Sequence, residues 1–248
     1  MKLLFLGASS AFCVGANQFQ SNMLLESNSG NKLLIDCGTD IRHSLHAQGY
    51  SQVDINAVYI SHLHSDHTGG LEWLGFASRF IDVEKPDLYI SSTLTKRLWD
   101  NVLCGGMSSI ESEKATLASF FYIHEIKKGF SWEEYDFELV KTIHYYSNRE
   151  VMPSYGLLIN NGYKTIFITT DTRFYPELEE IFNKAELIFH DCETDINSGQ
   201  HARYQELKTL KPEIKKKIWL YDYNNDDLPD AKSDGFLGFI KAGQSFKF

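Results

Sequence analysis

The feature that most constrains this chain is a group of three histidines and one aspartate within six residues: His62, His64, Asp66 and His67. The apolar run 57–60 before the group is typical of a buried strand, and the glycines at 69–70 allow a tight turn after it. The group is therefore expected on a loop at the end of a strand. Imidazole and carboxylate ligands suit metals such as Zn²⁺, and because the first two histidines point one way and the later pair diverges, we expect two metal ions. The alternative is a polar turn whose histidines only cap and hydrogen-bond.

His144 is a further candidate ligand, because it follows the run 137–143, whose rough alternation of apolar residues predicts a strand. A lone histidine after a strand has no special meaning by itself, but beside a metal motif the same position favours a ligand role. A helix is expected after Asp40, and we interpret His43 and His46 on that helix as surface residues.

These motifs resemble those of a known superfamily. The His62-x-His64-x-Asp66-His67 run after a strand resembles the signature of the metallo-β-lactamase superfamily, and residues 1–11 resemble the opening of its ribonuclease Z-like branch. Within that branch, size and motif order are most similar to the phage anti-Pycsar cyclic-nucleotide phosphodiesterases. The resemblance implies an α/β fold, a four-layer αββα sandwich of two mixed sheets, in a single domain over residues 1–248.

The resemblance also implies roles for later residues. Asp171 follows a strand expected at 165–168 and matches the superfamily's bridging aspartate; its two oxygens can hold two cations, although it could instead cap a helix. His201 matches the histidine that donates a proton to the leaving group, and Asp191 matches the acid that orients it. A histidine held by a carboxylate keeps the correct tautomer and a raised pKa. The alternative role for His201 is to cap the amphipathic helix that it is expected to open.

Asp222 marks a departure from the family pattern. It follows the run 218–221, which predicts a strand, where the family usually has a final metal-binding histidine. Asp222 lies 21 residues after His201 (222 minus 201), close to the family interval, so we align it with that histidine. A carboxylate in place of an imidazole hardens the second site and favours Mn²⁺ or Mg²⁺-like ions over Zn²⁺ there.

The expected site therefore holds two divalent ions, with Zn²⁺ favoured and Mn²⁺ an alternative at the Asp222 position. We assign His62, His64 and His144 to one ion and Asp66, His67 and Asp222 to the other, with Asp171 bridging. Such a pair presents a metal-bridged hydroxide at neutral pH and neutralises charge on phosphoryl oxygens. Asp66 would also hold the proton of that hydroxide, and His201 would protonate the departing ribose oxygen. The expected reaction is hydrolysis of a phosphodiester.

Composition and the spacing of the motifs narrow the class of substrate. The formal net charge is −9, whereas proteins that grip a polynucleotide backbone usually carry a basic face. The interval from His144 to Asp171 is 27 residues (171 minus 144), too short for the tRNA-binding arm that ribonuclease Z carries there. We therefore expect a small anionic nucleotide, favouring cyclic mononucleotides such as cCMP, cUMP, cAMP or cGMP, and a role in counteracting cyclic-nucleotide immune signalling. Aromatic residues near the expected mouth could stack a base, but are more often core: Phe120, Phe121, Tyr145 and Tyr146.

Other functions remain open, including a nucleotide-binding module without turnover and a lactonase or β-lactamase. A ribonuclease Z-like RNA phosphodiesterase shares the fold and site, and a mononuclear-iron persulfide dioxygenase shares the His-x-His-x-Asp-His run. Four scattered cysteines without a Cys-x-x-Cys pair indicate free thiols in a reducing compartment. No apolar run is long enough for a membrane span and no export signal is recognisable, so we expect a cytoplasmic protein with no membrane partner.

Further elements are expected elsewhere. Two β-hairpins are predicted, at 23–36 and 157–168, and a helix capped by Ser92 or Thr93 is predicted to run through Val102. Residues 105–119 have weak periodicity and form either a lid or subunit contact or an ordinary surface loop. Family members close the site within a dimer using this region, so the resemblance implies a homodimer. Residues 236–248 are expected to end the chain as a strand or strand pair.

Overall fold

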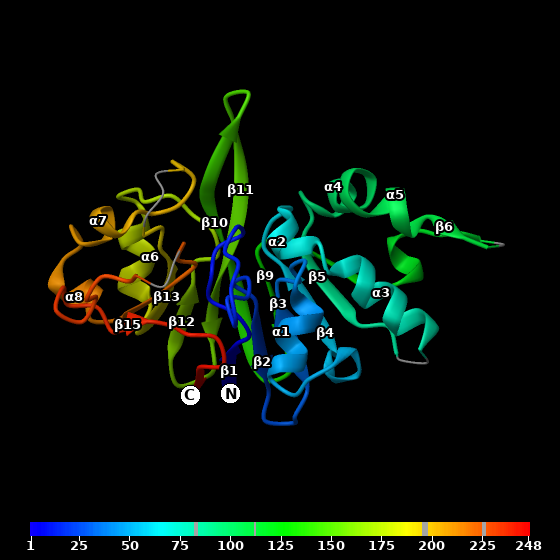
Figure 1. The fold of residues 1–248 in the computed structure, drawn as a ribbon, viewed down its shortest axis with the longest axis horizontal. Helices are drawn as coiled ribbons and strands as arrows, with labels where there is room; N and C mark the ends of the chain where they lie inside the picture. Colours follow the sequence, from blue (N-terminus) through cyan, green and yellow to red (C-terminus); the bar gives the residue numbers. More distant parts are fainter. Residues whose placement is uncertain (82–83, 112, 195–197, 225–226) are drawn as a thin grey trace.

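The computed structural model describes residues 1–81, 84–111, 113–194, 198–224 and 227–248. Its framework is a pair of seven-stranded mixed sheets with helices on their outer faces (Figure 1). A separate small hairpin projects from one side. This arrangement confirms the α/β fold of two mixed sheets that the sequence predicted.

The first sheet joins an antiparallel meander to a parallel half. Strands β16, β1, β2 and β3 pair antiparallel, and β3, β4, β5 and β8 pair parallel. In spatial order the strands are β16 (Ser245–Lys247), β1 (Lys2–Phe5), β2 (Met23–Glu26), β3 (Lys32–Ile35), β4 (Ala57–Ile60), β5 (Asp87–Ser91) and β8 (Tyr122–Ile126). The connections of the parallel half include α1 (Ile41–Ala47), η1 (Gln52–Asp54), α2 (Ser65–Thr68) and α3 (Leu71–Phe80).

The second sheet has a similar mixed design. Strands β9 to β12 pair antiparallel, and β12 to β15 pair parallel. In spatial order they are β15 (Gly238–Phe239), β14 (Ile218–Tyr221), β13 (Leu187–Asp191), β12 (Thr165–Ile168), β11 (Glu150–Asn160), β10 (Tyr135–Ser147) and β9 (Gly129–Trp132). Its outer face carries α6 (Leu178–Lys184), α7 (Tyr204–Leu207) and α8 (Pro212–Lys215).

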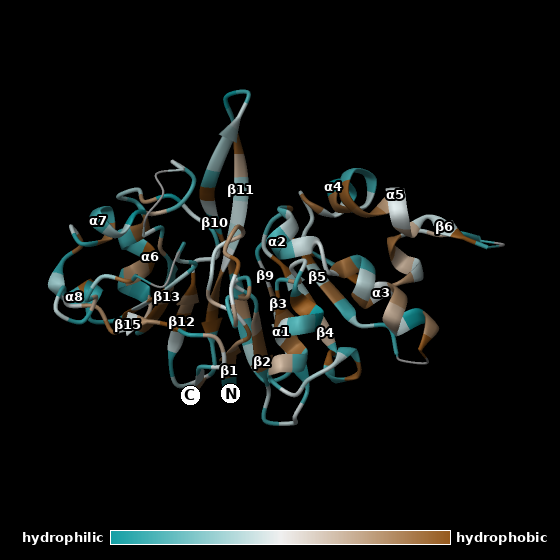
Figure 2. Ribbon diagram, viewed as in Figure 1, coloured by the Kyte–Doolittle hydropathy of each residue, from teal (hydrophilic) through white to brown (hydrophobic). Residues whose placement is uncertain are grey.

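The largest apolar side chains between the sheets form one continuous core. Phe5 of β1 contacts Phe189 of β13 and Tyr221 of β14, with ring centroids 5.2 and 5.5 Å apart. Two further apolar clusters lie on the outer faces, under α1 and α3 on one side and under α6 to α8 on the other. Figure 2 shows the hydrophobic residues concentrated on the strands and on the helix faces turned toward them. Because strand residues alternate between faces, each sheet supplies both the central core and an outer layer.

The strand that carries His144 continues well beyond the predicted end. β10 and β11 pair as far as Ser147 and Glu150, and the hairpin projects above the sheets (Figure 1). Its two turn residues, Asn148 and Arg149, have positive φ values of 51° and 69°, as the tight turns of twisted hairpins require. The sequence did not reveal this extension because residues beyond the core are exposed and lose the apolar alternation.

The helix predicted from Ser92 or Thr93 begins later and without a side-chain cap. It starts as α4 (Thr95–Arg97) and continues through η2 (Leu98–Leu103) into α5 (Cys104–Met107), with Leu94 at the N-cap. The Thr93 hydroxyl is engaged elsewhere, because it lies 2.8 Å from the hydroxyl of Tyr155. The helix expected to open at His201 likewise begins at Tyr204.

The segment 105–119 has more order than a surface loop. Beyond α5 it contains the hairpin of β6 (Ser109–Ile110) and β7 (Glu113–Lys114), then η3 (Leu117–Ser119). Met107 and Leu117 are buried in the apolar cluster under α1 and α3, together with Phe120 and Phe121. The two phenylalanines are therefore core residues and do not stack on a base. The C-terminal strands β15 and β16 lie in different sheets rather than forming a pair. Among the described residues, no helix is both long and apolar enough to cross a membrane.

Candidate metal centre

The two sheets bring their polar strand ends to one place. His62 and His64 follow β4, and Asp171 follows β12, each at the carboxyl end of a strand in the parallel half of its sheet. His144 reaches the same place by another route: β10 shifts register between Ile143 and Tyr145, and this irregularity leaves His144 out of the ladder. Bulges of this kind re-aim a side chain, here toward the other sheet.

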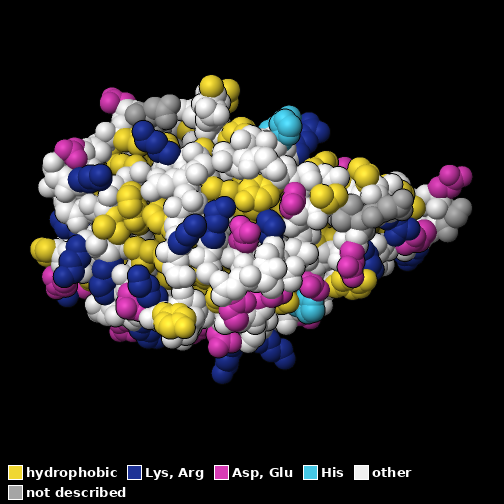
Figure 3. Space-filling view, turned by 90° about the horizontal axis from the view of Figure 1, so that it is seen from below, with side chains coloured by type: hydrophobic (Ala, Val, Ile, Leu, Met, Phe, Trp, Pro, Cys, Tyr) yellow, Lys and Arg dark blue, Asp and Glu magenta, His cyan; other side chains and the backbone are white. Residues whose placement is uncertain are grey.

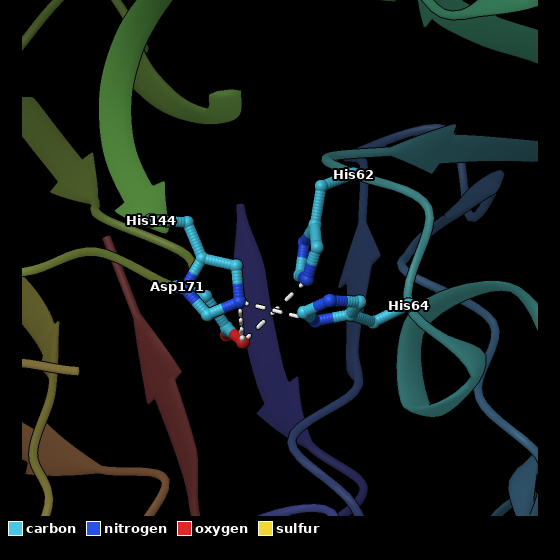
Figure 4. Close-up of side chains that lie close together, drawn as sticks. All are labelled: His62, His64, His144 and Asp171. Carbon is cyan, nitrogen blue, oxygen red and sulfur yellow. Dashed lines mark hydrogen bonds and ion pairs between the residues drawn. The ribbon is translucent and has the colours of Figure 1, made fainter. Parts of the chain in front are cut away.

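The first group consists of His62, His64, His144 and Asp171, whose ligand atoms all lie within 4.8 Å of one another. Figure 4 shows the three imidazoles and the carboxylate pointing toward a common centre. His144 Nε2 is 3.1 Å from His64 Nδ1, and Asp171 Oδ2 is 3.6 Å from Nε2 of both His62 and His144. The three histidines predicted to share one ion are thus together.

The second group consists of Asp66, His67 and Asp171. His67 Nε2 lies 3.1 Å from Asp66 Oδ2 and 3.3 Å from Asp171 Oδ2. Asp66 and His67 belong to the short helix α2, which begins directly after His64. Asp171 is thus shared between the two groups, at the position that the bridging prediction requires.

Asp222 also lies at this centre, beside His201. It forms a third group with Asp171 and His201 and not with Asp66 and His67. Asp222 Oδ1 accepts a hydrogen bond of 2.7 Å from the Ser21 hydroxyl, and Oδ2 lies 3.5 Å from His201 Nδ1. Burial and the nearby charge of Asp171 raise the pKa of Asp222 to about 7. Its role as a metal ligand stays a prediction.

His201 lies beside a carboxylate that can fix its orientation. Its Nδ1 is 3.0 Å from Asp191 Oδ2, an oxygen that also accepts a hydrogen bond from the backbone N–H of Thr172. Burial by itself would lower the pKa of His201, but the hydrogen bond to Asp191 and the charges of Asp171 and Asp222 outweigh it and raise that pKa to about 10. Asp191 is thus close enough to orient His201, and that role stays a prediction.

Asp36, which sequence reasoning missed, supports two of the histidines. Its Oδ2 lies 2.8 Å from His67 Nδ1 and accepts a 2.7 Å hydrogen bond from the Ser61 hydroxyl. Because that hydroxyl donates to Asp36, it can accept from His62 Nδ1, 3.0 Å away. Asp36 is the residue after strand β3, so its position at a strand end was the available signal. Such outer carboxylates fix the tautomer of a metal-binding histidine.

A backbone acceptor fixes the tautomer of His144 in the same way, because its Nδ1 lies 3.1 Å from the backbone oxygen of Gln200. With Nδ1 as the donor in all three cases, His62, His67 and His144 present the Nε2 lone pair to the centre. Burial lowers the pKa of His144 to about 4 and that of His62 well below its usual value, so both are neutral.

The unpaired atoms of the site match a metal's requirements. Nε2 of His62 and Oδ1 of Asp171 are buried with no hydrogen-bond partner among the described residues. A buried polar atom left unpaired costs free energy, commonly about 1–3 kcal/mol. A divalent cation accepted by these nitrogen and oxygen donors would remove that cost, so the residues present fit the metals that the sequence predicted.

The fold and this centre define the class of protein. The metallo-β-lactamase fold protein YhfI from Bacillus subtilis superposes with a TM-score of 0.75 at 19% sequence identity, covering 99% of this chain and 98% of that one. A likeness at this identity concerns the fold. The chain is therefore a protein of the metallo-β-lactamase fold with a histidine- and aspartate-lined candidate metal centre.

The sequence comparisons are more specific. The family model described as "Anti-Pycsar protein Apyc1" matches residues 1–246. An anti-Pycsar protein Apyc1 from Paenibacillus harenae is 35% identical over 229 residues, covering 91% of this chain and 90% of that protein. Another from Paenibacillus sp. (strain J14) is 34% identical, covering 97% and 96%. The chain belongs to the anti-Pycsar protein Apyc1 family, which confirms the resemblance found in the sequence.

Proposed function

We propose that this protein is a phosphodiesterase that uses two divalent metal ions to hydrolyse small cyclic nucleotides. The observation that carries the proposal is the position of Asp171, which belongs to every group of candidate ligands found among the described residues. A carboxylate shared in this way is suited to two cations a few ångströms apart. Membership of the anti-Pycsar family supports the choice of a cyclic nucleotide and a role in opposing cyclic-nucleotide immune signalling.

In this proposal His62, His64 and His144 hold one ion, and Asp66 and His67 hold the other, with Asp171 between them. Asp222 would complete the second site through its Oδ2, which is the oxygen that Ser21 leaves free. When bound, two such ions supply Lewis acidity to the phosphoryl oxygens and a hydroxide nucleophile at neutral pH. Zn²⁺ suits the histidine-rich site, and the carboxylate-rich site accepts Mn²⁺ as well.

The protein's own acid is His201. Its Nδ1 is engaged by Asp191, so its Nε2 would carry the proton transferred to the departing ribose oxygen. Asp191 is fully buried and its Oδ2 is also held by the Thr172 amide, so its carboxylate keeps the imidazole in one tautomer. Tyr145 stacks on His64 with ring centroids 5.0 Å apart, which restrains the ligand and leaves that face of Tyr145 closed to a base.

A small substrate is favoured over a polynucleotide. The formal net charge is −9, and Figure 3 shows basic and acidic side chains interspersed on the face seen from below, without one continuous basic band. Binding to a nucleic-acid backbone depends on neutralising many phosphates. A cyclic mononucleotide carries a single phosphate, so it needs no such band.

The oligomeric state is part of the proposal. We expect a homodimer in the cytoplasm, with the projecting hairpin β6–β7 contacting the second copy (Figure 1). Light scattering on the purified protein would then give about twice the 28.4 kDa of one chain. A mass of one chain at micromolar concentration would contradict this part.

The experiment that tests the function is a substrate panel. The protein is incubated with cyclic AMP, GMP, CMP and UMP and with bis(p-nitrophenyl) phosphate, under Zn²⁺ and Mn²⁺, beside His64→Ala. His46→Ala, which removes an exposed histidine on α1, is the matched control. We expect cleavage by the wild type and by His46→Ala, and its loss in His64→Ala. Absence of cleavage by the wild type under both metals would contradict the proposed function.

A further inference from the structure

A cavity adjoins the candidate metal centre beside His201. It has a volume of about 290 Å³ and is lined by Arg173, Phe174, Gly199, His201, Arg203 and Glu206. Small-molecule sites commonly span about 300–1,000 Å³, so this cavity matches one part of a small ligand, such as a phosphate with its sugar. His201 belongs to both the cavity and the third ligand group, so a molecule could occupy both places at once.

Arg173 is held rigidly in the wall of this cavity. Its backbone N–H donates to the oxygen of Ile143 (2.8 Å), and its Nε donates to the oxygen of His144 (3.2 Å). The guanidinium also lies over the ring of Tyr146, 5.2 Å from the centroid. The side chain is thus tied to the backbone of a candidate metal ligand, and its two terminal amino groups have no hydrogen-bond partner in the part of the chain that the structure describes.

The charge of Arg173 is not neutralised by any residue that the structure describes. No carboxylate among the described residues lies within ion-pair distance of it, although the side chain is half-buried. Arg203, in the same cavity, differs: its Nη2 is 3.3 Å from Glu206 Oε1. One cation of the cavity is therefore paired and the other is left to attract an anion.

We infer that the terminal amino groups of Arg173 bind the phosphate group of a small nucleotide beside the metal centre. A planar guanidinium with two free N–H groups matches two phosphate oxygens, and its position is set before the ligand arrives. The inference rests on the proposed function for the nucleotide, and names the residue that recognises its charge. Phosphate chemistry is shared by the intact diester, the monophosphate product and free phosphate.

The test is calorimetric titration of the metal-loaded protein with 5′-AMP, inorganic phosphate and adenosine. The variants are Arg173→Gln, Arg173→Lys and the charge-matched control Lys216→Gln, an exposed residue at the end of α8. We expect Arg173→Gln to weaken binding of AMP by about 10- to 100-fold, with Arg173→Lys intermediate and Lys216→Gln equal to the wild type. Adenosine, which lacks the phosphate, should be insensitive to all three changes.

Comparison of AMP with inorganic phosphate shows which part of the ligand Arg173 recognises. An equal loss of affinity for the two anions in Arg173→Gln means that the phosphate alone is recognised. A larger loss of affinity for AMP means that the sugar contributes to the same contact. AMP binding unchanged in Arg173→Gln would overturn the inference. So would a loss of bound metal in that variant, since Arg173 would then act only through His144. Cyclic-nucleotide cleavage serves to separate the two proposals, because Arg173-dependent binding without cleavage contradicts only the proposed function.

Discussion

His144 Nε2 lies 3.1 Å from His64 Nδ1, although the two residues are 80 positions apart and come from different sheets. Burial lowers the pKa of both imidazoles, so both are neutral at neutral pH, and the single N–H that each retains allows one hydrogen bond between these two nitrogens. In the metal-loaded protein, a cation would replace that proton and accept both nitrogen lone pairs. The two sheets must therefore pack against each other before these candidate ligands can meet, so the candidate metal centre forms only in the folded protein.

Removal of metal should destabilise the protein. The buried Nε2 of His62 and Oδ1 of Asp171 lose a partner when the ion leaves. An ion at 100 times its dissociation constant contributes about 2.7 kcal/mol, which corresponds to roughly 5–10 °C in Tm for a chain of this size. Differential scanning fluorimetry after chelation, and again after adding Zn²⁺ or Mn²⁺, measures this. A Tm unaffected by either treatment would contradict the prediction.

His201→Ala should separate acid catalysis from metal binding. Loss of a general acid costs about 10²- to 10⁴-fold in rate when the leaving group is a ribose oxygen. The p-nitrophenolate released from bis(p-nitrophenyl) phosphate needs no proton, so its rate should fall much less. Rates on both substrates, together with metal content, decide the point. Equal losses on the two substrates would remove His201 from the role of acid.

Asp222→His should change metal preference. The substitution replaces a carboxylate by an imidazole, so the second site becomes softer. We expect activity in the variant to favour Zn²⁺ over Mn²⁺ more strongly than in the wild type. Ser21→Ala is the companion variant, because it frees Asp222 Oδ1 without changing the ligand type. An unchanged ratio of Zn²⁺ to Mn²⁺ activity in Asp222→His would place residue 222 outside the metal shell.

The core between the sheets should determine stability. Phe5→Ala removes a fully buried ring packed on Phe189 and Tyr221 and should lower the free energy of unfolding by about 3–5 kcal/mol. Phe12→Ala, at a residue 89% exposed, should change it by less than about 0.5 kcal/mol. Because both sheets share this core, we propose that residues 1–248 form a single domain. Two separate transitions in urea denaturation would contradict that.

The sequence located the candidate metal-site residues better than their surroundings. His62, His64 and His67 could be placed because a strand, a loop and a helix follow one another within a few residues. The hydrogen bond from Ser21, 201 positions away, that holds one carboxylate oxygen of Asp222 could not be predicted, and the assignment of Asp222 to the second ion stays a prediction. Long-range contacts of this kind leave no local pattern.

Other features were missed for related reasons. Asp36 supports His62 and His67, yet an aspartate after a strand is common in loops. The bulge that aims His144 and the long β10–β11 hairpin depend on pairing between strands, which a single strand's residues do not encode. The helix expected at Thr93 began at Thr95 because a tertiary contact with Tyr155 engages the capping hydroxyl.

The measurement closest to the central claim is the metal content of the Zn²⁺-loaded protein and of Asp171→Ala, by mass spectrometry after buffer exchange. If Asp171 joins two ions, the wild type should hold about two per chain and the variant fewer than about one. A wild type that holds a single ion, or an Asp171→Ala variant that still holds two, would contradict the account.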